Sequence, residues 1–262
     1  MTASHDRSRV VSSFTIIKGA LIPETYELFK HWDFSLSRRE NLTRMKREDL
    51  VGAGNVHWLR DLGKVFNRRF DPASRDRALV ELAKSGCQLN IWRPLLLWHM
   101  TRDEFLLRDF LVNWLYSAFS DGVFHIGTKD VLPYLETLRG QDVVIEGKWS
   151  DATAQRVAAG LLKIAVDFEL LRGSTVKEFR SYHLPDEVFL YVLHAASERE
   201  HNAKKVIDLP DWRMYLMAPA DVERELFRLH QYRKLDYQVA GSVQQLSLPC
   251  RTAAEYARRI AA

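Results

Sequence analysis

Basic side chains recur every four residues in the first third of the chain, at Arg60, Lys64 and Arg68, with Arg69 directly after the last of them. Residues four apart lie on one face of an α-helix, so this spacing predicts a positively charged helical face. Lysine and arginine side chains bind phosphates, and Asn, Gln and Arg are the side chains that read base edges. The chemistry that this face could perform is therefore nucleic-acid binding.

The elements that would position this face lie on both sides of a glycine-rich turn. Ser37 with Glu40 predicts a capping box at the start of a helix over about residues 38–51, and Asn55 predicts the cap of a second helix over about 56–70. The Gly-Ala-Gly sequence between them predicts a break. Helix, tight turn and helix is the order of a helix-turn-helix, whose second helix enters the major groove of DNA.

The candidate DNA-binding residues of this basic helix-turn-helix, about residues 38–70, come from both helices and from the end of the turn. They are Arg38, Arg39, Arg44, Lys46, Arg47, Asn55, His57, Arg60, Lys64, Arg68 and Arg69. Those of the first helix would lie near flanking phosphates, and those of the second would reach the groove. The alternative is a solvated helix face whose charges are balanced by Asp61 and Glu48.

A second candidate module, about residues 129–184, has the order of a winged helix-turn-helix. We expect Thr128 to cap a short helix over about 129–138, Ser150 to cap a long helix to about Leu171, and the residues after 175 to alternate as a strand. Its candidate DNA-binding residues are Thr153, Gln155, Arg156 and Lys163, with Lys177 and Arg180 in the wing. Acidic residues at 151 and 167 weaken this interpretation, and the alternative is a helical module that contacts protein.

The remaining pattern predicts a mainly α-helical globule with helix-turn-helix and winged-helix-like modules and one or two small β-hairpins. Residues 88–120 are the most apolar stretch, so we expect two or more buried helices there, the second capped by Thr101 with Glu104. A chain of 262 residues has room for two domains. We place an N-terminal helical domain at 1–125, with the basic helix-turn-helix and the apolar core, and a C-terminal helical domain at 126–262, with the winged-helix-like module.

The C-terminal domain is also expected to contain a terminal β-hairpin over about residues 235–248. It follows a predicted helix over 220–232, so the helix-then-wing order recurs as a weaker third candidate for DNA binding or as a dimerisation element.

Composition excludes a membrane protein and a disulfide scaffold. No stretch approaches the roughly 18 consecutive apolar residues of a membrane-spanning helix, and the first ten residues lack the apolar core of a signal peptide. We therefore expect a cytoplasmic protein without a membrane partner. Cys87 and Cys250 stand alone and far apart, which predicts neither a disulfide nor a zinc site.

Known catalytic patterns are missing from the sequence. It contains no Walker-type phosphate loop, no dinucleotide glycine fingerprint and no recognisable nucleophile context. His194, Glu198 and His201 share a helical face, but half of a di-iron motif without its partner predicts a solvated helix end. We expect no enzyme activity, no cofactor and no metal.

Charge is distributed unevenly along the chain. Residues 1–80 carry 15 Lys and Arg against 10 Asp and Glu, residues 81–223 carry 16 against 21, and residues 224–262 carry 7 against 3. A polyanion would therefore meet the basic ends of the chain before its acidic middle.

Three stretches are similar to a known family: residues 12–25, residues 41–70 with the ending Phe66-Asn67-Arg68-Arg69-Phe70, and residues 149–171 with the beginning Trp149-Ser150-Asp151. They resemble the BrxA family, small core proteins of the BREX bacteriophage-exclusion systems. The resemblance covers about residues 10–250. It implies an all-helical globule that binds double-stranded DNA without known catalysis, encoded beside a methyltransferase and ATPase components.

The resemblance places the family's helix-turn-helix regions at Asn55–Arg69 and Ser150–Lys163. It supplies no base-reading residues, so the choice of side chains above depends on helical geometry alone. The hairpin over 235–248 departs from an all-helical description of the family.

The sequence therefore predicts a non-enzymatic component of a phage-defence system that binds double-stranded DNA. We expect a monomer, with other BREX proteins as further candidate partners. Two alternatives stay open. One is a protein-interaction scaffold for the methyltransferase or other components, and the other is a helix-turn-helix transcription regulator, which would need a fixed operator and usually a dimer.

Overall fold

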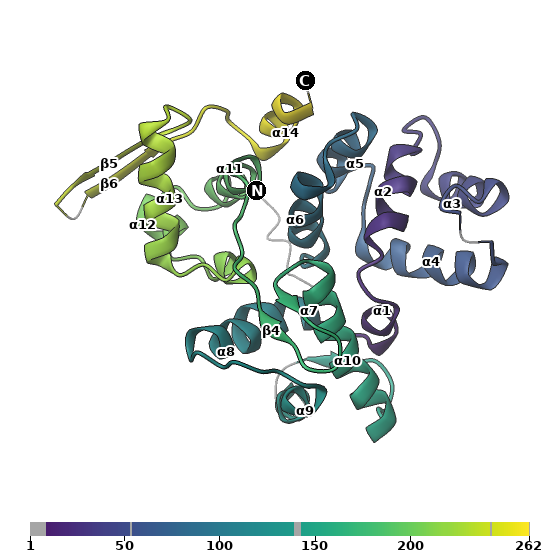
Figure 1. Ribbon diagram of the computed structural model, residues 1–262. Coiled ribbons are helices and arrows are strands. Elements are labelled where there is room, and N and C mark those ends of the chain that lie inside the picture. The colour runs from purple at the N-terminus through teal and green to yellow at the C-terminus, as the bar shows by residue number, and fades with distance from the viewer. Residues whose placement is uncertain (1–8, 53, 139–142, 242, 262) are drawn as a thin grey trace.

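The computed structural model describes residues 9–52, 54–138, 143–241 and 243–261 and is mainly α-helical, as the sequence predicts (Figure 1). The helices are α1 Ser13–Lys18, α2 Ile22–Lys30, α3 Arg38–Glu48, α4 Val56–Arg69, α5 Arg77–Lys84, α6 Leu89–Met100, α7 Phe105–Asp109, the π-helical η1 Phe110–Leu115, α8 Tyr116–Ser120, α9 Thr128–Thr137, α10 Asp151–Asp167, α11 Asp186–Ser197, α12 Ala203–Ile207, the 3₁₀-helical η3 Pro210–Tyr215, α13 Pro219–Gln231 and α14 Ala253–Ala261.

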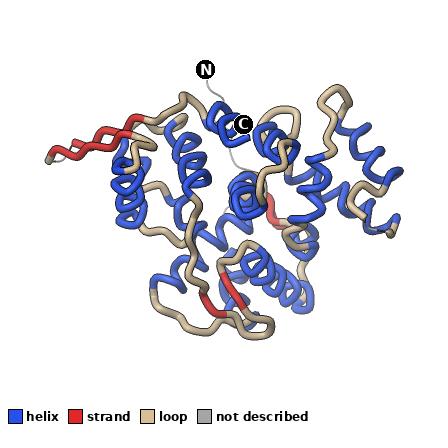
Figure 2. The backbone as a smooth tube through the Cα atoms, turned by 45° about the horizontal axis from the view of Figure 1, so that its top comes forward, coloured by secondary structure: helices blue, strands red, loops and turns tan. Residues whose placement is uncertain are grey.

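Within the described ranges, three two-stranded sheets accompany these helices. β1 (Val10–Val11) pairs in parallel with β2 (Val144–Ile145), and β3 (Leu171–Arg172) pairs antiparallel with β4 (Glu178–Phe179). β5 (Asp236–Ala240) and β6 (Val243–Ser247) form the predicted terminal hairpin, which projects from the helical body (Figure 2).

The helices are arranged around a central group of α6, α7 and α10 (Figure 1). α1 to α4 lie on one side of this group, with α3 and α4 at the edge, and α11 to α13 with the hairpin lie on the other. α14 packs against α5 and α11, and α1 packs against α10, so helices far apart in sequence are neighbours. The N-terminal and C-terminal parts of the chain therefore interlock.

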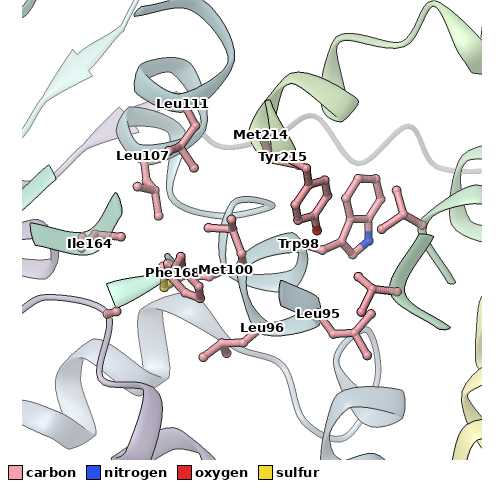
Figure 3. Close-up of a cluster of buried hydrophobic side chains, with 14 of the residues drawn as sticks. Leu95, Leu96, Trp98, Met100, Leu107, Leu111, Ile164, Phe168, Met214 and Tyr215 are labelled. Carbon is pink, nitrogen blue, oxygen red and sulfur yellow. The ribbon is translucent and has the colours of Figure 1, made fainter. Parts of the chain in front are cut away.

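One hydrophobic cluster fills the centre and draws on both parts of the chain (Figure 3). Leu95 and Leu96 of α6 are fully buried, and they share this cluster with Phe168 and with Tyr215 of η3. The Tyr215 hydroxyl donates a hydrogen bond to the Pro94 carbonyl oxygen at 3.0 Å. The proposed division at residue 125 stays a prediction, and this core runs across it.

The long helix of the second module ends earlier than the sequence predicts. α10 stops at Asp167 rather than near Leu171, because Glu169 takes a left-handed conformation with φ of 63° and turns the chain into β3. Gly173 follows with φ of 103°, and a Cβ there would lie 2.3 Å from the Val176 carbonyl oxygen. The strands of the predicted wing are therefore β3 and β4, joined by a turn that requires glycine.

Two other local predictions are wrong. Thr128 does not cap α9; it is the first helical residue, and the Gly127 amide donates to the Asp130 carboxylate at 2.7 Å. Thr101 and Glu104 do not form a capping box, because the Thr101 hydroxyl donates to the Leu97 carbonyl and Glu104 is engaged elsewhere. Both errors concern which of several adjacent polar groups caps a helix.

Candidate nucleic-acid interface

α3 and α4 form the helix pair that the caps predict. Ser37 and Glu40 form a capping box: the Ser37 hydroxyl accepts from the Glu40 amide, and the Glu40 carboxylate accepts from the Ser37 amide. The Asn55 side-chain oxygen accepts from the amides of His57 and Trp58 and so caps α4. The candidate base contact Asn55 therefore uses its oxygen within the protein, and its two amide hydrogens remain for another partner.

The turn between the helices is held by Asp49. This residue ends α3 in the left-handed region with φ of 44°, and its carboxylate accepts from the Gly54 amide at 2.8 Å. Gly52 and Gly54 both have positive φ, which explains why two glycines occupy so short a connection. α4 therefore begins close to the end of α3.

A lysine of α3 reaches across to α4. The Cε atom of Lys46 lies 3.4 Å from the position that a Cβ on Gly63 would occupy. Gly63 lies one helical turn from Arg60 and next to Lys64, so the three basic side chains share one region of the α3–α4 surface. Arg39 lies two turns before Lys46 on the same side of α3.

These four residues, Arg39, Lys46, Arg60 and Lys64, are here named the α3–α4 basic face. All four are exposed. Among the described residues, only Arg60 has an acidic partner within 4.0 Å, and this contact with Asp61 is long, at 3.9 Å. The other three have no ion pair within that part of the chain, so their charge is available to solvent or to an anion.

Asp61 is neutralised from outside the basic face. Its carboxylate accepts from Lys18 of α1 at 2.8 Å, and this hydrogen bond lowers the pKa of Asp61. The Lys18 ammonium also lies 5.2 Å from the centre of the Trp58 ring. The alternative from the sequence is that Asp61 balances the basic residues of α4. In the structure Asp61 instead forms its short ion pair with Lys18, which lies 43 residues away. Sequence spacing gave no signal for Lys18.

Four other predicted residues are held in ion pairs at the edges of the helix pair. Arg38 contacts Asp71, Arg44 contacts Asp33, Arg47 contacts Glu48 and Arg68 contacts Glu146. The Arg68–Glu146 contact, at 2.7 Å, joins α4 to the segment after β2 and lowers the pKa of Glu146. A phosphate would have to compete with these carboxylates, so these arginines offer less than the α3–α4 basic face.

Arg69 does not belong to the surface, which corrects its place among the candidate residues. Its side chain is 1% exposed and donates to the Glu104 carboxylate at 3.0 Å. Its other nitrogens donate to the backbone carbonyls of Thr15, Gly19 and Ala20. The next residue on an α-helix is turned by about 100°, so Arg68 faces outward while Arg69 faces the core.

The second module brings its predicted elements together as well. α9, α10 and the β3–β4 pair follow one another, and Ile126, just before α9, forms a bridge with Lys177 beside β4. α1 covers one side of α10 so closely that a Cβ on Gly160 would lie 2.8 Å from the Ile16 carbonyl oxygen. Only a narrow face of α10 therefore remains exposed.

The predicted residues of α10 differ in their exposure to solvent and in whether their side chains already have a partner. Gln155 and Arg156 are exposed, and Arg156 has no ion pair within the described chain. Thr153 is partly buried, and its hydroxyl is hydrogen bonded to Ser150 at 3.1 Å. Lys163 is exposed but lies 3.8 Å from Asp167 of the same helix. This helix offers fewer free cations than the α3–α4 basic face.

Comparison with known proteins identifies the family. The family model described as BrxA matches residues 13–195, about two thirds of the chain. The chain belongs to the BrxA family. Membership makes it a component of BREX phage-defence systems, as the resemblance of the three stretches implied. Neither the curated proteins nor the solved structures contain a significant match.

The BrxA match includes both candidate modules and ends within α11, before the β5–β6 hairpin. Across the described residues, no helix has the length and apolar character needed to cross a lipid bilayer. The same part of the chain contains no group of three or more His, Cys, Asp or Glu arranged to hold a metal ion.

Proposed function

We propose that this BrxA-family protein binds double-stranded DNA through the α3–α4 basic face and contributes to phage defence by binding rather than by catalysis. The observation that supports this most strongly is the position of Lys46 over Gly63, which joins the free cations of two helices into one surface. A surface of separated lysines and arginines suits a polyanion, because each phosphate that is neutralised releases a condensed counterion.

The geometry favours contact with the sugar–phosphate backbone over sequence readout. Two of the four side chains of the face are lysines, which contact phosphate as point charges. The Asn55 oxygen already accepts two hydrogen bonds at the start of α4, so Asn55 cannot form the two-bond contact with adenine that needs this oxygen. Phosphate contacts position a protein on DNA without reading its sequence. We therefore expect binding to unrelated duplexes with little sequence preference and a strong dependence on salt.

The test is to measure binding of a short, unrelated duplex by fluorescence anisotropy from roughly 50 to 200 mM salt, the range over which phosphate contacts weaken strongly. Arg60→Ala/Lys64→Ala is expected to weaken binding and to reduce the slope of log K against log salt by about 1.8, since each phosphate contact contributes about 0.9. Both residues are exposed, so the variant should fold as the wild type does.

Lys204→Ala/Lys205→Ala is the matched control. It also removes two exposed positive charges, which here form ion pairs with Asp208 and Glu200, from α12, on the opposite side of the central helices (Figure 1). The control should keep the wild-type slope. An equal loss of DNA affinity in both variants would show that only net charge matters. Unchanged binding in Arg60→Ala/Lys64→Ala would refute the assignment of the DNA site to the α3–α4 basic face. No binding of the wild type even at low salt would refute DNA binding altogether.

A second candidate function is contact with another protein of the same defence system. Phe124, before α9, is 79% exposed, and Val176, in the turn between β3 and β4, is 51% exposed. The bridge between Ile126 and Lys177 holds these two segments side by side. Exposed apolar side chains gathered in one place favour a protein partner over DNA. Co-purification of another BREX component that survives nuclease and high salt, and that Phe124→Ser abolishes, would support this.

A further inference from the structure

A cavity of about 440 Å³ lies between α5, α11 and α14, away from the α3–α4 basic face. Figure 1 shows these three helices converging beside the end of α6. Five arginines line the cavity, namely Arg75, Arg77, Arg102, Arg199 and Arg258, against two glutamates. Its volume lies within the range of roughly 300–1,000 Å³ that is typical of small-molecule sites.

Two of the five arginines are already paired. Arg75 forms ion pairs with Asp76 and Asp103, and Arg77 pairs with Glu81 at 2.7 Å. The second glutamate of the lining, Glu198, accepts a hydrogen bond from the Ala253 amide at the start of α14. Glu81 and Glu198 therefore bind partners other than Arg102, Arg199 and Arg258.

Arg102, Arg199 and Arg258 lack an acidic partner among the described residues. Arg258 donates only to the Ala254 carbonyl of its own helix, and Arg102 and Arg199 form no side-chain hydrogen bond or ion pair within the described chain. Burial lowers the pKa of Arg102, because its guanidinium is withdrawn from water. Asp76 attracts the Arg102 guanidinium without touching it and offsets only part of this burial cost. An anion bound in the cavity would offset the rest.

A rigid chain of hydrogen bonds lies behind these arginines. The buried His99 ring bonds to Asp76 at 2.7 Å and to the Tyr191 hydroxyl at 2.8 Å, and Tyr191 lines the cavity. Burial lowers the pKa of His99, so the neutral ring donates to Asp76 and accepts from Tyr191. The Tyr191 hydroxyl is thus used as a structural donor, and the cavity is suited to binding rather than to nucleophilic chemistry.

We propose that this cavity binds a small phosphorylated ligand whose phosphate group is held by Arg102, Arg199 and Arg258. Guanidinium groups match the geometry of phosphate oxygens and form two hydrogen bonds at once. Three cations from three different elements surround the cavity, which suits a compact anion. Arg199 and Arg258 are exposed and Arg102 is partly buried. The cations of the α3–α4 basic face are spread along two helices, which suits an extended anion instead.

The test measures thermal stability and calorimetric binding of the full chain with inorganic pyrophosphate and, separately, with adenosine monophosphate. Both probes carry phosphate, and only the second carries a nucleoside. We expect saturable binding that raises Tm. Arg199→Ala and Arg258→Ala should each weaken it by about tenfold or more, because each removes a charge-assisted hydrogen bond.

Arg259→Ala is the matched control, since Arg259 lies beside Arg258 on α14 but does not line the cavity. The control should bind pyrophosphate as the wild type does, and Arg60→Ala/Lys64→Ala should do so too. Equal loss in Arg258→Ala and Arg259→Ala, or no saturable binding of either probe, would overturn the proposal. Displacement of pyrophosphate by a short DNA duplex would also overturn it and assign the cavity to the DNA backbone.

Discussion

The ion pair between Arg69 and Glu104 is a buried contact between residues that lie 35 positions apart in the sequence. Both side chains are almost fully buried, at 1% and 2% exposure, and their atoms lie 3.0 Å apart. Glu104 also accepts from the Thr15 hydroxyl, so the pair connects the end of α4, the start of α7 and the segment around α1. We predict that replacing Arg69 with Met destabilises the whole protein.

The expected loss follows from what the substitution leaves behind. Among the described residues, Arg69→Met leaves the Glu104 carboxylate with only the Thr15 hydroxyl as a partner and removes the donor to three backbone carbonyls. Breaking one side of a buried ion pair costs about 3–5 kcal/mol, and this is a large part of the roughly 5–15 kcal/mol that stabilises a typical protein. At about 2–4 °C for each kcal/mol, Tm should fall by roughly 6–20 °C.

A thermodynamic cycle with Glu104→Gln tests the cause of this loss. In Arg69→Met the unpaired carboxylate is the main cost, so adding Glu104→Gln should restore part of the stability rather than lower it further. Urea unfolding followed by circular dichroism measures all four proteins. A loss below about 1 kcal/mol in Arg69→Met, or simple addition of the two single effects, would refute this account. The folded fraction of Arg69→Met should keep the wild-type salt slope for DNA.

Two further predictions concern pH and packing. Burial lowers the pKa values of His99 and His194 in the folded protein. Below about pH 6.5 these histidines gain protons more readily in the unfolded chain, so the folded state loses stability as the pH falls. Tm should therefore decrease from pH 7 to pH 5, and a flat profile would contradict this. Gly160→Ala should lower the free energy of unfolding by about 1–3 kcal/mol, because the new Cβ would meet the Ile16 carbonyl oxygen. Gly63→Ala should be neutral or stabilising, because only the flexible end of Lys46 lies near its Cβ. Equal effects of the two substitutions in chemical unfolding would contradict the packing described.

Local signals in the sequence correctly predicted where three of the helices begin. Ser37, Asn55 and Ser150 cap α3, α4 and α10 in the structure, each through its side-chain oxygen. These contacts join residues at most three positions apart, so the sequence contains all the information that they need. The helix order of both candidate modules follows from such signals.

Long-range pairing could not be predicted in the same way. Glu104 lies 35 residues from Arg69, and Lys18 lies 43 residues from Asp61. By local pattern alone, Glu104 suits a capping box with Thr101, and Arg69 suits a DNA-binding face. Which charges remain free depends on such distant partners, and only the fold reveals them.

The number of unpaired basic side chains limits how strongly DNA could bind to the basic helix-turn-helix. Of the eleven residues that the sequence assigned to it, four form the α3–α4 basic face, and Arg38, Arg44, Arg47 and Arg68 are paired while Arg69 is buried. Four phosphate contacts would give a slope of log K against log salt of about −3.6. A measured slope of this size is accounted for by that face alone. A distinctly steeper slope requires further phosphate contacts, either from the paired arginines of α3 and α4 or from Arg156 and Lys163 on the exposed side of α10. Loss of the additional slope in Arg156→Ala/Lys163→Ala would assign these contacts to α10, and an unchanged slope in that variant would assign them to the paired arginines.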